Sequence, residues 1–223
     1  MKRLGRLSLI LLLGGFAVVL LRALWALPAV PLHLGDAVAG KMDQSGVSHP
    51  LTAVLLNFRG YDTLLEIGVL LMAGLAALAV SGKADATPRA ELLDRPAVLL
   101  GLMRVLVPVL VVVAFYLLWI GSYRPGGAFQ AGAMLGACGV LLVLAGVIEQ
   151  VRVTWRARLA LCLGFLVFLL VSALVMGHGR ELLAYPVAQA GLWILLIEAA
   201  ATLSIGAIFT LLFLGVVARE DEP

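Results

Sequence analysis

Charged residues are scarce in this chain. They make up 13% of its 223 residues, while 63% are hydrophobic. Soluble domains carry about 25% charged residues, so this chain has too few of them to cover a surface that faces water. The composition therefore excludes an ordinary soluble protein and predicts an integral membrane protein.

Cysteine and histidine are also scarce, which limits the cofactors that the chain can hold. Cys138 and Cys162 both lie within apolar runs, and two thiols are too few for an iron–sulfur cluster. A disulfide is not expected. The histidines, His33, His49 and His178, all fall in predicted outer loops, which leaves none in the membrane to hold a haem. We expect no cofactor and no metal bound to this chain alone.

Runs of about 20 apolar residues predict transmembrane helices. Six are present, at about 7–27, 63–81, 98–120, 128–148, 157–177 and 188–217. The first also fits a secretory signal with a basic amino-terminal region, but its apolar run is long for one and no clear A-x-A site follows. We expect an all-α protein with six transmembrane helices, the first of them uncleaved.

The basic residues predict the orientation of these helices. They form short clusters between apolar runs, which is typical of topology signals, so the net charge of +3 does not indicate a nucleic-acid partner. Ten basic residues in tails and loops fall on one side, against four on the other, which places both termini in the cytoplasm. The ten are Lys2, Arg3, Arg6, Lys83, Arg89, Arg95, Arg152, Arg156, Arg158 and Arg219, and the four are Lys41, Arg59, Arg124 and Arg180.

A polar, proline-containing segment divides the chain into two modules. This predicted cytoplasmic linker covers residues 83–96. Residues 1–82 are expected to form a two-span module, and residues 97–218 a four-span domain that an acidic tail, 219–223, follows. The apolar stretch 51–56 is too short to span a membrane, so it is expected to lie along the outer interface or to pack on a neighbour.

Glu198 stands in an apolar run from Leu192 to Leu214 that is otherwise free of charge. A charged side chain at the bilayer centre costs roughly 2.5–3.5 kcal/mol, so such residues usually face a protein interior or a water path. If the helix begins near Val187, Glu198 lies about 16 Å along it, close to mid-membrane. Two interpretations are open: a proton relay, or a protonated or paired glutamate that only ties helices together.

A second polar cluster lies at residues 57–66. On a helix Asp62 and Glu66 share a face, and Arg59 is close enough to pair with either. Two carboxylates and an arginine at a membrane entrance suit the passage of protons or cations. The same residues also match a capping box, in which Thr63 caps the helix and Glu66 bonds back. Both interpretations stay open on these residues alone.

The third predicted span contains Arg104 about two turns from its start, and Pro108, which is expected to kink or loosen it. Arg104 either extends to the cytoplasmic surface or pairs with a buried carboxylate.

Glycines mark the predicted outer turn between the third and fourth spans. Gly126 and Gly127 form a tight re-entry, and Ala128, Gly132 and Gly136 then recur at every fourth residue. Small residues at this spacing allow close contact between helices. Taken alone, these glycines indicate helix packing.

Together these segments resemble the multisubunit cation/proton antiporters of the Mrp, or Mnh, type. Asn57-Phe-Arg-Gly-Tyr-Asp-Thr-Leu-Leu-Glu66 is similar to the (D/N)-(F/Y)-R-G-(F/Y)-D-T-x-x-E segment near the end of the large A subunit, which also occurs in the small E subunit of related membrane-bound hydrogenases. Residues from about 97 to 217 resemble the B subunit, with a proline-bearing helix, a Pro-Gly-Gly turn and a late glutamate. The family turn reads Gly-His-Asn-x-Pro-Gly-Gly-Gly-Phe, whereas this chain has Gly121-Ser-Tyr-Arg-Pro-Gly-Gly-Ala-Phe129.

The resemblance implies a transporter subunit rather than an enzyme. It implies exchange of Na⁺ or another monovalent cation for protons, in a bacterial cytoplasmic membrane, among membrane lipid and other antiporter subunits both large and small. The residues that it places on the ion path are Glu66, Glu198 and Asp62, supported by Arg59, Arg104 and Thr63. A membrane-arm subunit of a complex-I-related, redox-driven pump uses the same modules and is an alternative, as is a purely structural scaffold.

Overall fold

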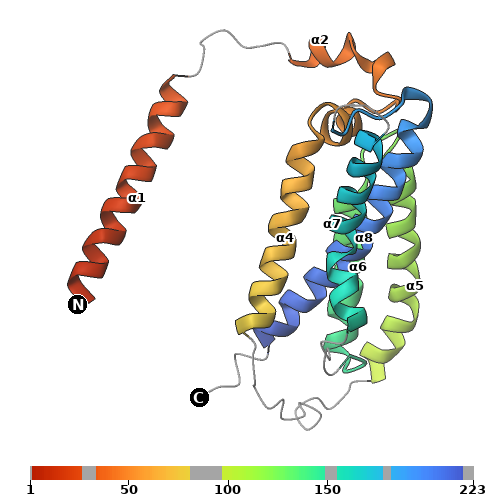
Figure 1. Cartoon of the computed structure of the whole chain (residues 1–223). Coiled ribbons are helices and arrows are strands. Elements are labelled where there is room, and N and C mark those ends of the chain that lie inside the picture. Colours follow the sequence, from red (N-terminus) through yellow and green to blue (C-terminus); the bar gives the residue numbers. More distant parts are fainter. Residues whose placement is uncertain (1, 27–33, 81–96, 149–154, 178–181, 218–223) are drawn as a thin grey trace. The chain divides into compact units, whose positions relative to one another are not determined.

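The computed structural model describes residues 2–26, 34–80, 97–148, 155–177 and 182–217. Every regular element in these ranges is helical (Figure 1). The elements are α1 (Lys2–Trp25), α2 (Leu34–Ala39), the 3₁₀ helix η1 (Met42–Gln44), α3 (Pro50–Ala53), the π-helix η2 (Val54–Phe58), α4 (Gly60–Val80), α5 (Ala97–Ile120), α6 (Ala128–Leu144), α7 (Trp155–Gly177) and α8 (Val187–Val217). The predicted all-α class is confirmed. The predicted linker, the acidic tail, His33 and His178 lie outside the described residues.

The chain forms two compact units, Met1–Ala37 and Val38–Pro223. In the first unit, the stretch Ser8–Trp25 of α1 is long and apolar enough to cross a membrane, and none of it is buried within the chain. Described by itself, this helix exposes its apolar side chains, among them Leu12, Phe16 and Val19.

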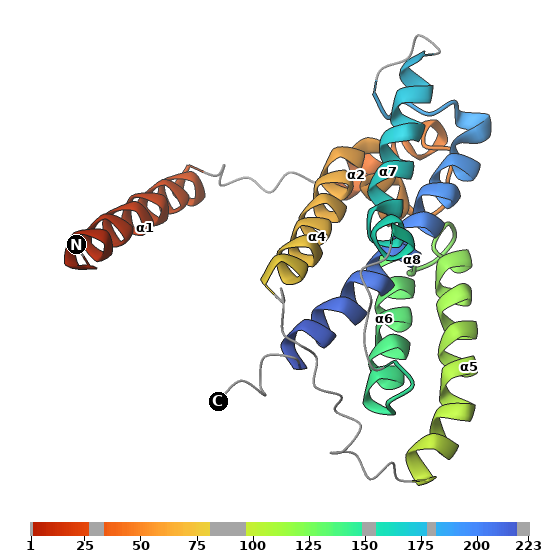
Figure 2. The same ribbon diagram turned by 60° about the horizontal axis from the view of Figure 1, so that its bottom comes forward.

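In the second unit α8 is the central helix, in contact with α4, α5, α6 and α7. Of its apolar window, 61% is buried, against 11% for α5, which lies at one edge of the unit with α4 at the opposite edge (Figures 1 and 2). The core around α8 contains Ile194, Ile197, Ile205 and Phe168, all fully buried. A helix with this much buried surface can place a polar side chain away from lipid.

Small residues let α6 and α7 approach α8 closely. A methyl group added at Gly132 would lie 2.7 Å from Cβ of Ile205, and one added at Gly136 would lie 2.7 Å from Cβ of Phe209. On α7, a methyl group at Gly164 would lie 2.8 Å from Cα of Ala201. Contacts this short exclude any larger side chain without a shift of the helices.

Five described helices contain a stretch long and apolar enough to span a membrane: Ser8–Trp25, Gly60–Ala79, Val98–Ile120, Trp155–Gly177 and Val187–Leu214. The remaining predicted span corresponds to α6, which has 17 residues. At 1.5 Å per residue α6 is about 25 Å long, somewhat less than the roughly 30 Å hydrocarbon core. The six-span count and the cytoplasmic placement of both termini stay predictions.

Candidate functional site

Glu198 is an acidic residue within the apolar helix α8, and it is buried, with 4% of its surface exposed. Three fully buried residues flank it on α8: Ile194 one turn before, Ile197 directly before and Ala201 one turn after. The burial follows from the central position of this helix, which turns most of its surface toward other helices. Glu198 therefore faces the protein interior and not lipid.

The carboxyl group of Glu198 meets the beginning of α6. The backbone N–H of Ala128, the first residue of that helix, donates a hydrogen bond to it. A methyl group added at Gly127 would lie 2.6 Å from Oε1 of Glu198. The positive end of a helix dipole favours negative charge, while the apolar surroundings favour the neutral acid. These opposing influences suit a group that gains and loses a proton.

The second carboxyl oxygen of Glu198, Oε2, is buried and has no hydrogen-bond partner among the described residues. An unsatisfied buried polar atom costs about 1–3 kcal/mol, so most proteins avoid one unless it has a use. Thr202, one turn further along α8, does not reach this atom. Its hydroxyl donates to the carbonyl oxygen of Glu198 at 2.7 Å and lies 3.5 Å from the carbonyl oxygen of Ala128.

The turn between α5 and α6, residues 121–127, holds this arrangement. Gly127 has φ 105° and ψ −169°, a conformation that L side chains rarely adopt. Its N–H donates to the carbonyl oxygen of Leu117 at 2.9 Å, and the N–H of Arg124 donates to that of Ile120 at 2.8 Å. The chain thus re-enters the helix bundle immediately next to Glu198.

Residues 45–58, the capping segment, pack on this turn. The hydroxyl of Thr52 donates to the carbonyl oxygen of Gly121, and the N–H of His49 and the hydroxyl of Ser48 donate to that of Ser122 at 3.2 and 3.1 Å. Asn57 ties the segment together through its side-chain N–H, which donates to the carbonyl oxygen of Ser45 at 2.7 Å. The stretch 51–56, predicted to be too short to span, is a short helical cap within the chain.

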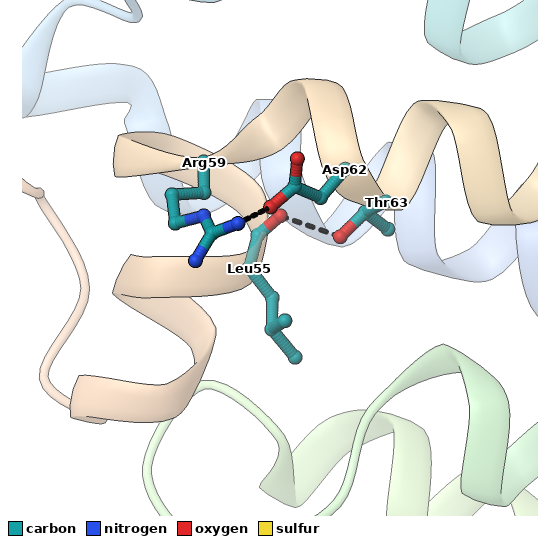
Figure 3. A network of polar contacts seen from close by, with 4 residues as sticks. All are labelled: Leu55, Arg59, Asp62 and Thr63. Atoms are coloured by element: carbon teal, nitrogen blue, oxygen red, sulfur yellow. Dashed lines mark hydrogen bonds and ion pairs between the residues drawn. The ribbon is translucent and has the colours of Figure 1, made fainter. Parts of the chain in front are cut away.

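The cluster at 57–66 forms separate contacts (Figure 3). Arg59 pairs with Asp62, N to O 2.5 Å, with side chains 67% and 45% exposed. Thr63 donates its hydroxyl to the carbonyl oxygen of Leu55 at 2.6 Å and is the fourth residue of α4, so it does not cap that helix. The capping-box interpretation is therefore wrong. Glu66 is exposed on α4, whereas Glu198 is buried on α8.

Arg104 is exposed on α5, and it forms no ion pair within the part of the chain that the structure describes. Arg104 is thus not paired with a buried carboxylate among the described residues. That its side chain extends toward the cytoplasmic surface stays a prediction.

Two further buried polar groups, one in the capping segment and one just before α8, belong to no motif that the sequence predicts as part of a site. Nδ1 of His49 and the hydroxyl of Tyr185 are buried without a hydrogen-bond partner among the described residues, and burial raises the pKa of Tyr185 well above its usual range. Within the same ranges, no three histidine, cysteine, aspartate or glutamate side chains gather as a metal site would require.

Comparisons with known proteins fit these features. Residues 98–219 match the family described as "Domain related to MnhB subunit of Na+/H+ antiporter". The fold is similar to a chain in the "Structure of Mrp complex from Dietzia sp. DQ12-45-1b", with a TM-score of 0.67 and 24% sequence identity. That similarity covers 97% of this chain and 27% of the other, so this chain spans about a quarter of the length of the chain it matches. No curated protein matches.

Proposed function

Because the chain belongs to the family of domains related to the MnhB subunit of Na⁺/H⁺ antiporters, we propose that it is a membrane subunit of an Mrp-type antiporter complex. The complex exchanges Na⁺ or another monovalent cation for protons across a bacterial cytoplasmic membrane. Exchange by the large antiporter-like subunits supplies most of the transport, and this chain lines or supports a path beside them.

The observation that carries this proposal is the setting of Glu198. Its carboxyl group is buried in the central helix, one oxygen has no partner in the described chain, and the N–H of Ala128 is bonded to the group. In its ionised form the group is stabilised by that N–H and by the positive end of α6. In its neutral form it becomes a donor through its O–H. Glu198 can thus hold a proton and release it without a change of fold.

Glu66 supports the assignment as a subunit. It lies about 9 Å from the start of α4, at 1.5 Å per residue, in a helix of membrane length. Its side chain is exposed and forms no ion pair within the described residues. Because a carboxylate exposed to lipid is costly, we propose that a neighbouring subunit covers it. There Glu66 would contribute to a proton or cation path, with Asp62 and Arg59 at its entrance.

The family description names an antiporter, which favours this function over a redox-driven pump. The two differ in the proteins that accompany the chain. Purification in mild detergent, followed by mass spectrometry, should recover large antiporter-like membrane subunits in stoichiometric amounts. Recovery of a hydrogenase large subunit and iron–sulfur proteins would support the redox-driven alternative instead.

Exchange itself is tested by deletion. Membrane vesicles from cells that lack this chain should lose Na⁺-dependent proton movement, and expression of the chain should restore it. Unchanged exchange in the deletion strain would contradict the proposal.

A further inference from the structure

Gly127, which directly precedes α6, differs from Gly132 and Gly136 within that helix in what it contacts. A methyl group added at Gly127 would meet Oε1 of Glu198 at 2.6 Å and Cδ of Glu198 at 3.7 Å, with Gln130 next at 4.0 Å. At Gly132 and Gly136 an added methyl group would instead meet the apolar side chains of Ile205 and Phe209. Helix packing therefore accounts for Gly132 and Gly136, but it does not account for Gly127.

The close approach of Glu198 to Gly127 also depends on the backbone conformation of this glycine. With φ at 105°, Gly127 turns its neighbour's N–H toward α8, and only glycine adopts this conformation readily. The result is that the carboxyl group of Glu198 lies over an α-carbon that bears no side chain while it accepts the hydrogen bond of Ala128. One residue thus provides both the space and the donor direction.

The turn that contains Gly127 is itself held by the capping segment. Gly121 packs on Gly127, since a methyl group at Gly121 would lie 2.7 Å from Cα of Gly127. The carbonyl oxygen of Gly121 accepts the hydroxyl of Thr52, a buried residue. A continuous series of contacts therefore runs from Thr52 through Gly121 and Gly127 to the carboxyl group of Glu198.

We propose that Gly127 is a positioning residue for Glu198, and that Thr52 fixes its position through the 121–127 turn. This inference rests on the proposed function of Glu198 and adds to it the part of the chain that sets the geometry of its carboxyl group. The capping segment, which lies before the linker, thereby acts on a residue of the MnhB-related domain. The 121–127 turn thus connects α5 to α6 and also positions the carboxyl group of Glu198.

The test combines Gly127→Ala with Glu198→Asp in the assembled complex. Gly127→Ala should reduce cation/proton exchange per complex at least as strongly as Glu198→Asp does. The shorter aspartate side chain ends further from the added methyl group. Glu198→Asp should therefore cause no further loss of exchange in the Gly127→Ala background. A partial recovery of exchange in the double variant would also support the proposal. Strictly additive losses would overturn the proposal, because residues that do not interact give additive effects.

A spectroscopic readout separates positioning from general damage. The infrared carboxyl band that disappears in Glu198→Gln reports the hydrogen bonding of Glu198. We expect this band to shift in Gly127→Ala and to stay unchanged in Gly132→Ala, which crowds Ile205 instead. An unshifted band in Gly127→Ala would overturn the proposal.

If the complex with Gly127→Ala does not assemble, Thr52→Val provides a second test. It removes the hydroxyl that holds Gly121 and keeps nearly the same shape, so the Glu198 band should shift, while Thr52→Ser should preserve it. Ser204→Ala is the matched control, because it removes a buried hydroxyl that donates to the carbonyl oxygen of Leu161 on α7. A band that Thr52→Val leaves in place would contradict the role of the capping segment.

These results are distinguishable from failure of the proposed function. Full exchange in Glu198→Gln would remove the proposed function and this inference with it. Loss of exchange in Glu198→Gln, together with normal exchange and a normal band in Gly127→Ala, would remove only the positioning role.

Discussion

The carboxyl group of Glu198 on α8 lies against Gly127, the turn residue directly before α6, although the two residues are far apart in the sequence. A methyl group in place of one hydrogen of Gly127 would lie 2.6 Å from Oε1. This contact brings the acidic residue of α8 and the glycine turn before α6 into one site. Through this contact the carboxyl group lies beside the start of α6, within a helix whose apolar window is 61% buried.

Glu66 is predicted to matter for exchange, and its neighbour Asp62 is not expected to matter for stability. Glu66→Gln should lower cation/proton exchange in membranes while the complex stays abundant, because the amide cannot carry a charge or a proton. Asp62→Asn breaks an exposed ion pair with Arg59, and exposed pairs contribute about 0–1 kcal/mol. Thermal unfolding of the purified complex should therefore change little in Asp62→Asn. Normal exchange in Glu66→Gln would exclude an ion-path role for Glu66.

Gly136 is predicted to be a packing residue. Gly136→Ala places a methyl group 2.7 Å from Cβ of Phe209, and such overpacking typically costs about 1–3 kcal/mol. The thermal midpoint of the complex should fall. Gly101→Ala on α5 is the control, since nothing lies within 4 Å of the position of its methyl group. An equal effect of both substitutions would mean that the approach of α6 to α8 is not what Gly136 provides.

The orientation is tested by cysteine labelling from either side of the membrane. After replacement of Cys138 and Cys162, single cysteines are introduced at Lys41, which is exposed, and at Ala86 in the predicted cytoplasmic linker. Lys41→Cys should react with an impermeant reagent from outside, and Ala86→Cys only after the membrane is opened. Reaction of both from the same side would contradict the six-span prediction.

The chain alone is expected not to transport. Reconstituted by itself into liposomes, it should show no Na⁺-dependent proton movement, because Glu66 lacks the neighbouring subunit proposed to cover it. The purified complex under the same conditions is the positive control. Robust exchange by the chain alone would contradict the role of a subunit.

Much of the helical architecture could be predicted from hydropathy, because apolar runs of membrane length have few alternatives to a helix. The predicted span 188–217 corresponds closely to α8, Val187–Val217. The span predicted at 128–148 instead ends as a helix at Leu144, and Gly146 follows with φ 66°. Glycine in this left-handed conformation commonly ends a helix, and an apolar run alone does not reveal it.

The candidate site was predictable only in part. The burial of Glu198 followed from the cost of a charge in lipid. Its contact with Gly127 did not. The Pro-Gly-Gly sequence predicts a turn from local residues alone, and nothing in it indicates which distant side chain packs against that turn. Thr63 matched a capping box, but the π-helix Val54–Phe58 brings the Leu55 carbonyl oxygen within reach of its hydroxyl. Local patterns specify turns and caps, while contacts between distant segments decide which of them form.

The central claim is that Glu198 carries protons in an antiporter complex. The most direct test is Na⁺-driven proton movement in liposomes that contain the purified complex, compared among the wild type, Glu198→Gln and Glu198→Asp at equal subunit content. Glu198→Gln should abolish or strongly slow exchange, because the amide keeps nearly the same size but cannot titrate, and Glu198→Asp should retain part of it. Full exchange in Glu198→Gln would contradict the claim.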